Sequence, residues 1–317
     1  MSQFLSNCTA DAILDAARHL KAGDLVAFPT ETVYGLGADA SNSQAVARIY
    51  SVKGRPSDHP LIVHIAAIER MGDWARDVPE YAIALARSFW PGPMTLILKR
   101  SELARDFITG GQDSVGVRVP DHVVALALLE AFERSGGKGV AAPSANRFGH
   151  VSPTTATAVI EELGNYLSKD DLILDGGACA VGVESTIIDC TGVAPSVLRP
   201  GAISVAMIEE CTVLKTRQSD KKIRVSGALE NHYAPIAKVL LGETPVPGQG
   251  FIAYANIETP QGVIRLASPK NDEEFAQVLY SALRKADTQG LSEVIVIEPV
   301  GIGIGVAIRD RLARASS

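Results

Sequence analysis

The sequence predicts an α/β protein with one large, open, mixed β-sheet and helices, followed by a smaller α/β domain. Three observations lead to this prediction. Apolar runs typical of strands alternate with segments of helical periodicity along the chain. Several of these runs follow one another too closely for a crossover helix, so the first sheet is expected to be mixed. Near residue 200, a polar, basic and strand-poor stretch separates the two regions.

The elements of the first region follow in order. The opening helix is expected to begin after Thr9, a possible N-cap, and to end at Gly23. Ile13, Ala17 and Leu20 share one of its faces. Further helices are predicted at residues 43–52 and 79–90, and strands at residues 25–30, 61–65, 95–99, 114–120, 139–144 and 171–175.

The second region repeats the alternation on a smaller scale. Phe275, Leu279 and Leu283 lie on one face of a helix predicted within residues 272–290. Strands are expected at residues 238–241, 250–255, 263–267 and 292–300, and a last helix near residues 308–315. The chain therefore divides into a first domain (1–204), a linker or lid (205–237) and a C-terminal domain (238–317).

The composition is that of an ordinary globular protein with an acidic surface. Of 317 residues, 46% are hydrophobic and 21% are charged, and the net charge is −6. Because no signal-type start and no run of about 18 apolar residues occurs, we expect a cytoplasmic protein without membrane association. Four scattered cysteines predict reduced thiols instead of a zinc site or disulfides. Any polyanion site must be a local basic groove.

Residues 29–65 carry most of the functional signal. Lys53 and Arg55 flank Gly54, and in an extended backbone these two cations would point to the same side. A cation pair of this kind is most often a solvated surface feature. Here Gly54 permits close approach of the backbone, and a polar, proline-rich loop containing His59 follows. This context favours the positioning of a polyphosphate by two fixed charges.

Two glycine patterns, at residues 35–40 and 301–305, are only weakly similar to dinucleotide-binding loops. In such loops an acid follows about 20 residues later at the end of a strand, whereas here Asp58 lies in the proline-rich loop. The second pattern lies too close to the C-terminus for a complete βαβ unit. No GxxxxGK[ST] sequence occurs, which excludes a P-loop.

Two strand residues carry polar groups that core packing alone does not explain. Strand alternation places His64 with Ile62 on one face, so the imidazole either lies satisfied in the core or lines a cleft. Arg118 lies among valines and needs a bidentate anion, which is either a structural acid or a ligand carboxylate. The residues alone leave both alternatives open.

Polar groups also follow the strand predicted at residues 139–144. Ser144 and Asn146 stand at its end, either in an ordinary turn or beside a ligand. Ser152 precedes Pro153 at an expected helix start. Its simplest role is an N-cap, which would also direct free amide groups toward an anion.

Taken together, these motifs resemble the threonylcarbamoyl-AMP synthase family in its long form. The shared landmarks are PTETVYGLG, KGRPSDHPLIVHI, WPGPMTLIL, SVGVRVP, AAPSANRFGHVSPTT, GVESTIID, VLRPGAIS and HYAP. The resemblance implies a YrdC-like catalytic domain with an open, twisted, mixed sheet, followed by a smaller Rossmann-like α/β domain. The linker before HYAP is expected to fold back over the nucleotide.

The resemblance also implies substrates and site residues. ATP, bicarbonate and L-threonine would give threonylcarbamoyl-AMP and pyrophosphate, with Mg²⁺ accompanying ATP on ligands that the sequence leaves unknown. Downstream threonylcarbamoyl transferase machinery would then modify tRNA. Positions matching the family's threonine site are Thr32, His64, Arg118, Ala142 and Ser185. Positions matching its ATP site are Lys53, Arg55, His59, Ser114, Ser144, Asn146, Ser152, Arg199 and Tyr233, of which Lys53 and Arg55 are the expected catalytic pair.

The chemistry of such a reaction agrees with these assignments. Threonine and bicarbonate give a carbamate that attacks the α-phosphorus of ATP, so positioning and charge neutralisation dominate and no nucleophilic side chain is required. Arg118 can hold a carboxylate by its fork, and a hydroxyl such as that of Thr32 can favour threonine. Lys53 and Arg55 would offset charge on the phosphates.

Two other functions remain open from the sequence. The first is a non-catalytic RNA-binding module, or weak RNA binding beside the enzymatic activity, against which the acidic net charge argues. The second is a related carbamoyl transfer enzyme that forms carbamoyl adenylate. The C-terminal domain and the HYAP motif favour the threonine enzyme.

Overall fold

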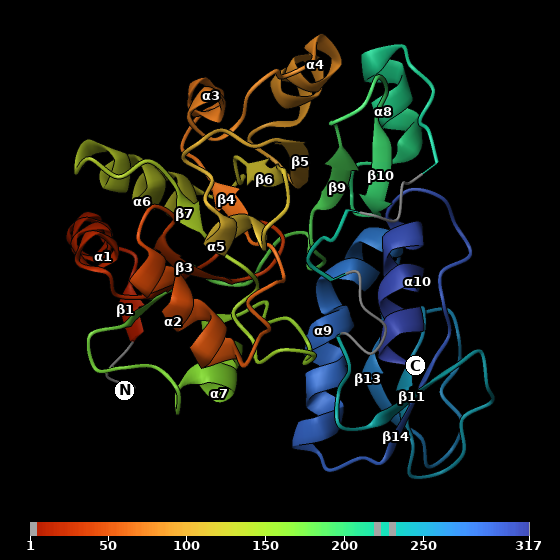
Figure 1. Cartoon of the computed structure of the whole chain (residues 1–317). Coiled ribbons are helices and arrows are strands. Elements are labelled where there is room, and N and C mark those ends of the chain that lie inside the picture. Colours follow the sequence, from red (N-terminus) through yellow and green to blue (C-terminus); the bar gives the residue numbers. More distant parts are fainter. Residues whose placement is uncertain (1–4, 219–222, 228–232, 317) are drawn as a thin grey trace.

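The protein has a large N-terminal lobe and a smaller C-terminal lobe, shown from red to green and in blue in Figure 1. A computed structural model describes residues 5–218, 223–227 and 233–316. The predicted linker includes residues 219–222 and 228–232, and these lie outside the described residues. None of the described helices is long and apolar enough to cross a membrane.

A ten-stranded mixed sheet runs through the large lobe among the described residues. Strand β4 pairs in parallel with β6 and antiparallel with β7, which confirms the predicted mixed sheet. The strands lie in the order β1 (Leu5–Asn7), β8 (Leu172–Asp175), β2 (Val26–Phe28), β3 (Gly35–Asp39), β7 (Val140–Ala141), β4 (Ile62–His64), β6 (Ser114–Arg118), β5 (Met94–Lys99), β9 (Thr186–Asp189) and β10 (Ser196–Arg199).

Helices cover this sheet, and the first of them begins and ends where the sequence supplies caps. Thr9 accepts a hydrogen bond from the amide of Ala12, and Gly23 ends the first helix with a left-handed φ of 97°, as predicted. The helices are α1 (Ala10–Ala22), α2 (Ser43–Lys53), the 3₁₀ turn η1 (Ile68–Arg70), α3 (Met71–Trp74), α4 (Glu80–Phe89), α5 (Asp106–Thr109), α6 (Val123–Arg134), α7 (Ala156–Leu163) and α8 (Val205–Thr212).

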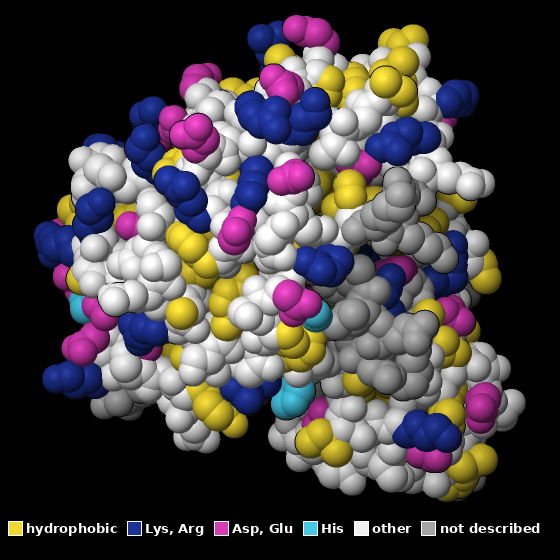
Figure 2. Space-filling view, viewed as in Figure 1, with side chains coloured by type: hydrophobic (Ala, Val, Ile, Leu, Met, Phe, Trp, Pro, Cys, Tyr) yellow, Lys and Arg dark blue, Asp and Glu magenta, His cyan; other side chains and the backbone are white. Residues whose placement is uncertain are grey.

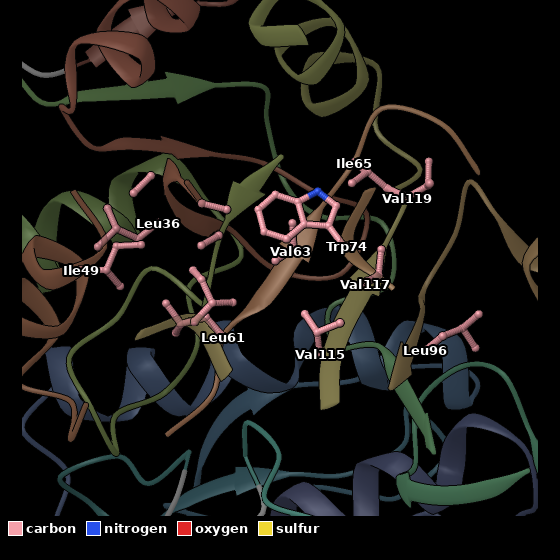
Figure 3. Close-up of a cluster of buried hydrophobic side chains, with 14 of the residues drawn as sticks. Leu36, Ile49, Leu61, Val63, Ile65, Trp74, Leu96, Val115, Val117 and Val119 are labelled. Carbon is pink, nitrogen blue, oxygen red and sulfur yellow. The ribbon is translucent and has the colours of Figure 1, made fainter. Parts of the chain in front are cut away.

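The main core lies against β4, β6 and β5. Val63 and Ile65 point into it beside the indole of Trp74, together with Val117 and Leu96 (Figure 3). Since strand side chains alternate, their neighbours on β4 face the opposite side of the sheet. That alternation places His64 and Ile62 at a pocket, which is one of the two alternatives that the sequence left open for His64.

The small lobe contains a four-stranded sheet in which every described pairing is parallel. Its order is β11 (Lys238–Leu241), β14 (Glu293–Val296), β12 (Gly250–Ile252) and β13 (Ile264–Ala267). Helices α9 (Asp272–Thr288) and α10 (Ile304–Ala315) pack on it and against the large lobe. Phe275 and Leu279 of α9 share a core with Val33, Val151 and Val183 of the large lobe, so the two lobes are joined by buried apolar contacts.

The segment from residue 205 starts as part of the large lobe. Helix α8 contacts α4, and its Ile208 is fully buried in the main core. Ser204 caps the helix by accepting from the amide of Met207. The stretch predicted as linker therefore begins with a helix that belongs structurally to the large lobe.

Candidate active site

One pocket lies between strands of the large sheet and the described part of the linker. Its empty space, which is open to solvent, amounts to about 530 Å³. Strands β4 and β6 contribute His64 and Arg118, and the linker contributes Ser226, Gly227 and Tyr233. The other lining residues are Thr30, Thr32, Val33, Gly35, Arg55, Ile62, Ala142, Pro143, Ser144, Glu184, Ser185 and Arg199.

All five residues predicted for the threonine site line this pocket. Arg118 Nη2 donates to Thr32 Oγ1 at 2.9 Å, and it also lies 2.7 Å from Glu31 Oε1. Arg118 thus has a structural acid as its partner, although its side chain still reaches the pocket. Ala142 contributes backbone near Ile62, whose carbonyl accepts from the Ala142 amide at 3.0 Å.

The imidazole of His64 is neutral in this setting. Burial, and next the nearby Arg118, lower its pKa to about 3. The ring lies edge-on to Phe28 with centroids 6.1 Å apart. A neutral imidazole adds no charge to the pocket and can offer a hydrogen bond, so the positive charge there comes from arginines.

Ser185 and Arg199 line the pocket and are hydrogen-bonded to each other. Arg199 Nε and Nη2 donate to the Ser185 carbonyl at 3.1 and 3.0 Å, and Nη2 also reaches Ser185 Oγ at 3.2 Å. The same hydroxyl is 2.8 Å from Thr95 Oγ1. These contacts hold Ser185, which was predicted to bind threonine, next to Arg199, which was predicted to bind ATP.

The residues predicted for ATP fall into three groups. Arg55, Ser144, Arg199 and Tyr233 line the pocket. Ser114 lines a neighbouring cavity. The remaining four, Lys53, His59, Asn146 and Ser152, do not line it.

Arg55 is a buried cation that lines the pocket. Its Nη2 donates to the Pro60 carbonyl at 3.0 Å and to Ser226 Oγ at 3.1 Å. Its Nε has no hydrogen-bond partner among the described residues. Burial lowers its pKa to about 10, so the guanidinium stays charged at neutral pH and retains a donor for an anion.

The predicted extended pairing of Lys53 with Arg55 is wrong. Lys53 is the last residue of helix α2, and Gly54 caps that helix with a left-handed φ of 64°. Lys53 Nζ donates to the carbonyls of Ser144 at 2.6 Å and Asn146 at 2.5 Å. Burial and the adjacent Arg55 lower the pKa of this amine well below its usual value. Lys53 therefore holds the loop that follows β7.

Ser152 is not the helix cap that the sequence suggested. Thr155 caps α7 by accepting from the amide of Ala158. The Ser152 hydroxyl instead donates to Glu184 Oε1 at 2.6 Å in a buried contact. The sequence showed a serine before a proline, but the helix starts later and leaves Ser152 free to bond across the fold.

Described linker residues close one side of the pocket. Arg199 Nη1 donates to the Ser226 carbonyl at 2.9 Å, which ties the linker to the large lobe. A Cβ on Gly227 would lie 1.9 Å from Tyr233 Oη, and its φ is +75°. Only glycine suits that position. The predicted lid therefore touches the pocket in its described parts.

Four residues that the sequence analysis did not single out contribute to this region. Glu31 and Glu184 lie inside the landmark motifs PTETVYGLG and GVESTIID. Their place in these motifs is the sequence feature that could have identified them as site residues. Ser226 and Arg311 carried no local signal, because each acts through a partner more than 100 residues away.

The described part of the pocket offers no ready carboxylate cage for a metal. Glu31 is paired with Arg118, and Glu184 with Arg311 at 2.8 Å. No group of three or more metal-ligating side chains occurs among the described residues.

Comparisons with known proteins place the chain in a family. A family model described as "Telomere recombination" matches residues 18–201, and one described as "Threonylcarbamoyl-AMP synthase, C-terminal domain" matches residues 203–317. The threonylcarbamoyl-AMP synthase of Pyrococcus abyssi is 42% identical, with 95% of this chain and 93% of the relative covered. That of Bacillus subtilis is 39% identical, with 96% and 92% covered.

A solved structure extends the likeness to three dimensions. The crystal structure of P. abyssi Sua5 complexed with L-threonine has a TM-score of 0.88 and 38% identity. It covers 98% of this chain and 97% of that one. The chain therefore belongs to the threonylcarbamoyl-AMP synthase family.

Proposed function

We propose that this chain is an L-threonylcarbamoyladenylate synthase, an enzyme that forms threonylcarbamoyl-AMP and pyrophosphate from ATP, bicarbonate and L-threonine. The observation that supports it most is the shared pocket. Residues matching the family's threonine site line it together with two buried arginines that match the ATP site, Arg55 and Arg199. The solved relative that contains L-threonine supports threonine as the amino acid.

The threonine end of the pocket is built for a small polar amino acid. Arg118 supplies a charged fork for the carboxylate, and Glu31 fixes its orientation at 2.7 Å. The hydroxyls of Thr32 and Ser185 are buried and can bond the substrate hydroxyl. Neutral His64 keeps the wall uncharged near the amine, which must lose a proton before it meets bicarbonate.

The ATP end supplies charge neutralisation. Carbamate oxygen attacks the α-phosphorus and pyrophosphate leaves, so negative charge moves onto the leaving group. Arg55 and Arg199 offer fixed guanidinium groups to that charge, and Tyr233 and Ser144 line the space beside them. Lys53 holds the Ser144 loop in place through backbone carbonyls.

Mg²⁺ is proposed as the ion that arrives with ATP. It would neutralise phosphate charge, while the protein's own arginines orient the triphosphate. We further propose that the product passes to tRNA-modifying threonylcarbamoyl transferase machinery in the cytoplasm.

A purely RNA-binding role has less support. Figure 2 shows basic and acidic side chains intermingled over the face in view, without a broad single-sign surface. The net charge of −6 points the same way. Weak RNA binding beside catalysis would appear as salt-dependent association.

Pyrophosphate release from ATP tests the proposal. Release that requires both L-threonine and bicarbonate supports the synthase. Release driven by carbamoyl phosphate without threonine supports the carbamoyl adenylate alternative, and no release under any of these conditions overturns the enzymatic proposal.

A further inference from the structure

We propose that the C-terminal domain completes the active site through Arg311, a positioning residue that fixes the pocket wall carrying Ser185 and Arg199. This inference rests on the proposed function of the pocket. Arg311 belongs to α10 and is 1% exposed, although it lies in the other lobe from the residues it orders. It is thus a buried cation directed from one lobe into the other.

Arg311 contacts both segments of that wall. Its Nε donates to Glu184 Oε2 at 2.8 Å, and its Nη2 donates to the Pro200 carbonyl at 3.1 Å. Glu184 directly precedes Ser185, and Pro200 directly follows Arg199. Arg311 therefore clamps the two chain segments whose pocket residues are bonded to each other.

Glu184 is the centre of this contact. Besides Arg311, its carboxylate accepts from Tyr280 Oη at 2.9 Å and from Ser152 Oγ at 2.6 Å. Tyr280 lies on α9 of the small lobe, and Ser152 belongs to the large lobe. Glu184 also lines the pocket. One carboxylate thus joins a pocket wall to two helices of the C-terminal domain.

The buried charge of Glu184 makes this contact depend on Arg311. Burial alone would raise the pKa of Glu184, but Arg311, Arg199 and the donors around it lower that pKa to about 2. The group is therefore ionised at every working pH. A buried carboxylate that loses its cation is strongly destabilised, so the wall keeps this arrangement only while the C-terminal domain is docked.

The same domain supports the linker side of the pocket. Tyr233 stacks on Tyr280 with centroids 5.8 Å apart, and the Arg311 guanidinium lies 5.3 Å from the Tyr233 ring centroid. Tyr233 lines the pocket. Arg311 and Tyr280 of the small lobe therefore support the pocket wall at Ser185 and the pocket wall at Tyr233.

The test compares Arg311→Met with a control that also breaks an ion pair between the lobes. Arg284 of α9 lies 2.8 Å from Glu162 Oε1, is partly buried and does not line the pocket, so Arg284→Met is the matched control. Arg311→Lys keeps the charge and tests for partial rescue. Kinetic constants from pyrophosphate release and melting temperatures are measured for the full chain.

We expect Arg311→Met to lower kcat/KM for ATP and threonine on the order of 10- to 100-fold, because misplacement of a positioning wall has effects of that size. Arg311→Lys should recover part of the loss. Arg284→Met should stay within about twofold of the unchanged protein even if its melting temperature falls equally. Equal kinetic losses in Arg311→Met and Arg284→Met, or none in Arg311→Met, would overturn the positioning role.

Hydrogen exchange provides a readout that needs no activity. Amides in residues 184–187 and 199–203 should exchange faster in Arg311→Met than in Arg284→Met. If the unchanged protein releases no pyrophosphate, the proposed function fails, and exchange alone decides the positioning role. Unchanged exchange in both segments would then overturn it.

Discussion

Acid should destabilise the large lobe through His64. The folded pKa is about 3, whereas an unfolded histidine has a pKa of about 6.5. Since the unfolded state alone binds this proton between those values, stability is full above pH 6.5 and falls as the pH decreases toward 3. Between pH 7 and pH 5 the loss from this one group is about 2 kcal/mol.

Urea unfolding at the two pH values measures that loss. The chain has two tryptophans, Trp74 and Trp90, and both lie in the large lobe, so their fluorescence reports its unfolding. His64→Gln removes the buried imidazole and should lose about 2 kcal/mol less than the unchanged protein between pH 7 and pH 5.

His150→Gln is the matched control, because the His150 side chain is 58% exposed and its replacement leaves the buried imidazole in place. It should keep the loss of about 2 kcal/mol that His64 contributes between pH 7 and pH 5. The pKa values of His59 and His122 are also lowered, chiefly by burial. Both residues are present in the unchanged protein and in the two variants, so their contribution to the loss of stability in acid cancels in the comparison. Equal acid losses in His64→Gln and the unchanged protein would refute the reasoning.

Three substitutions address the pocket and the loop that Lys53 holds beside it. Arg118→Lys keeps the charge but loses the fork, so we expect the KM for threonine to rise about tenfold with little change in the KM for ATP; equal changes in both constants would contradict this. Gly227→Ala should displace Tyr233 and raise the KM for ATP about tenfold in the pyrophosphate assay, because a methyl group has no room there; an unchanged KM would count against the described lid contact. Lys53→Met should lower kcat more than tenfold and reduce the urea midpoint, since two buried carbonyls lose their donor; normal turnover would show that this loop needs no fixed position.

Local patterns were enough to predict most elements of the fold. Thr9 and Gly23 bound the first helix as expected, because a cap and a left-handed glycine act within one turn. Alternation on β4 placed His64 at the pocket and Val63 in the core. Such features depend only on neighbours in the chain.

Features set by distant partners could not be predicted in the same way. Lys53 ends a helix because Gly54 caps it, and the apparent cation pair was consequently misread as extended. Ser152 bonds to Glu184 across the fold instead of capping the next helix. The contact of Glu184 with Arg311 spans 127 residues and two lobes, so no local spacing reveals it.

The central claim is that one pocket holds ATP and L-threonine together, between Arg55 and Arg118. Calorimetric titration of the purified full chain with L-threonine, in the absence and presence of a non-hydrolysable ATP analogue and Mg²⁺, tests this most directly. We predict one molecule of each ligand per chain, with threonine binding weakened by Arg118→Lys and analogue binding weakened by Arg55→Lys. Folded protein that binds neither ligand, alone or in combination, would contradict the account.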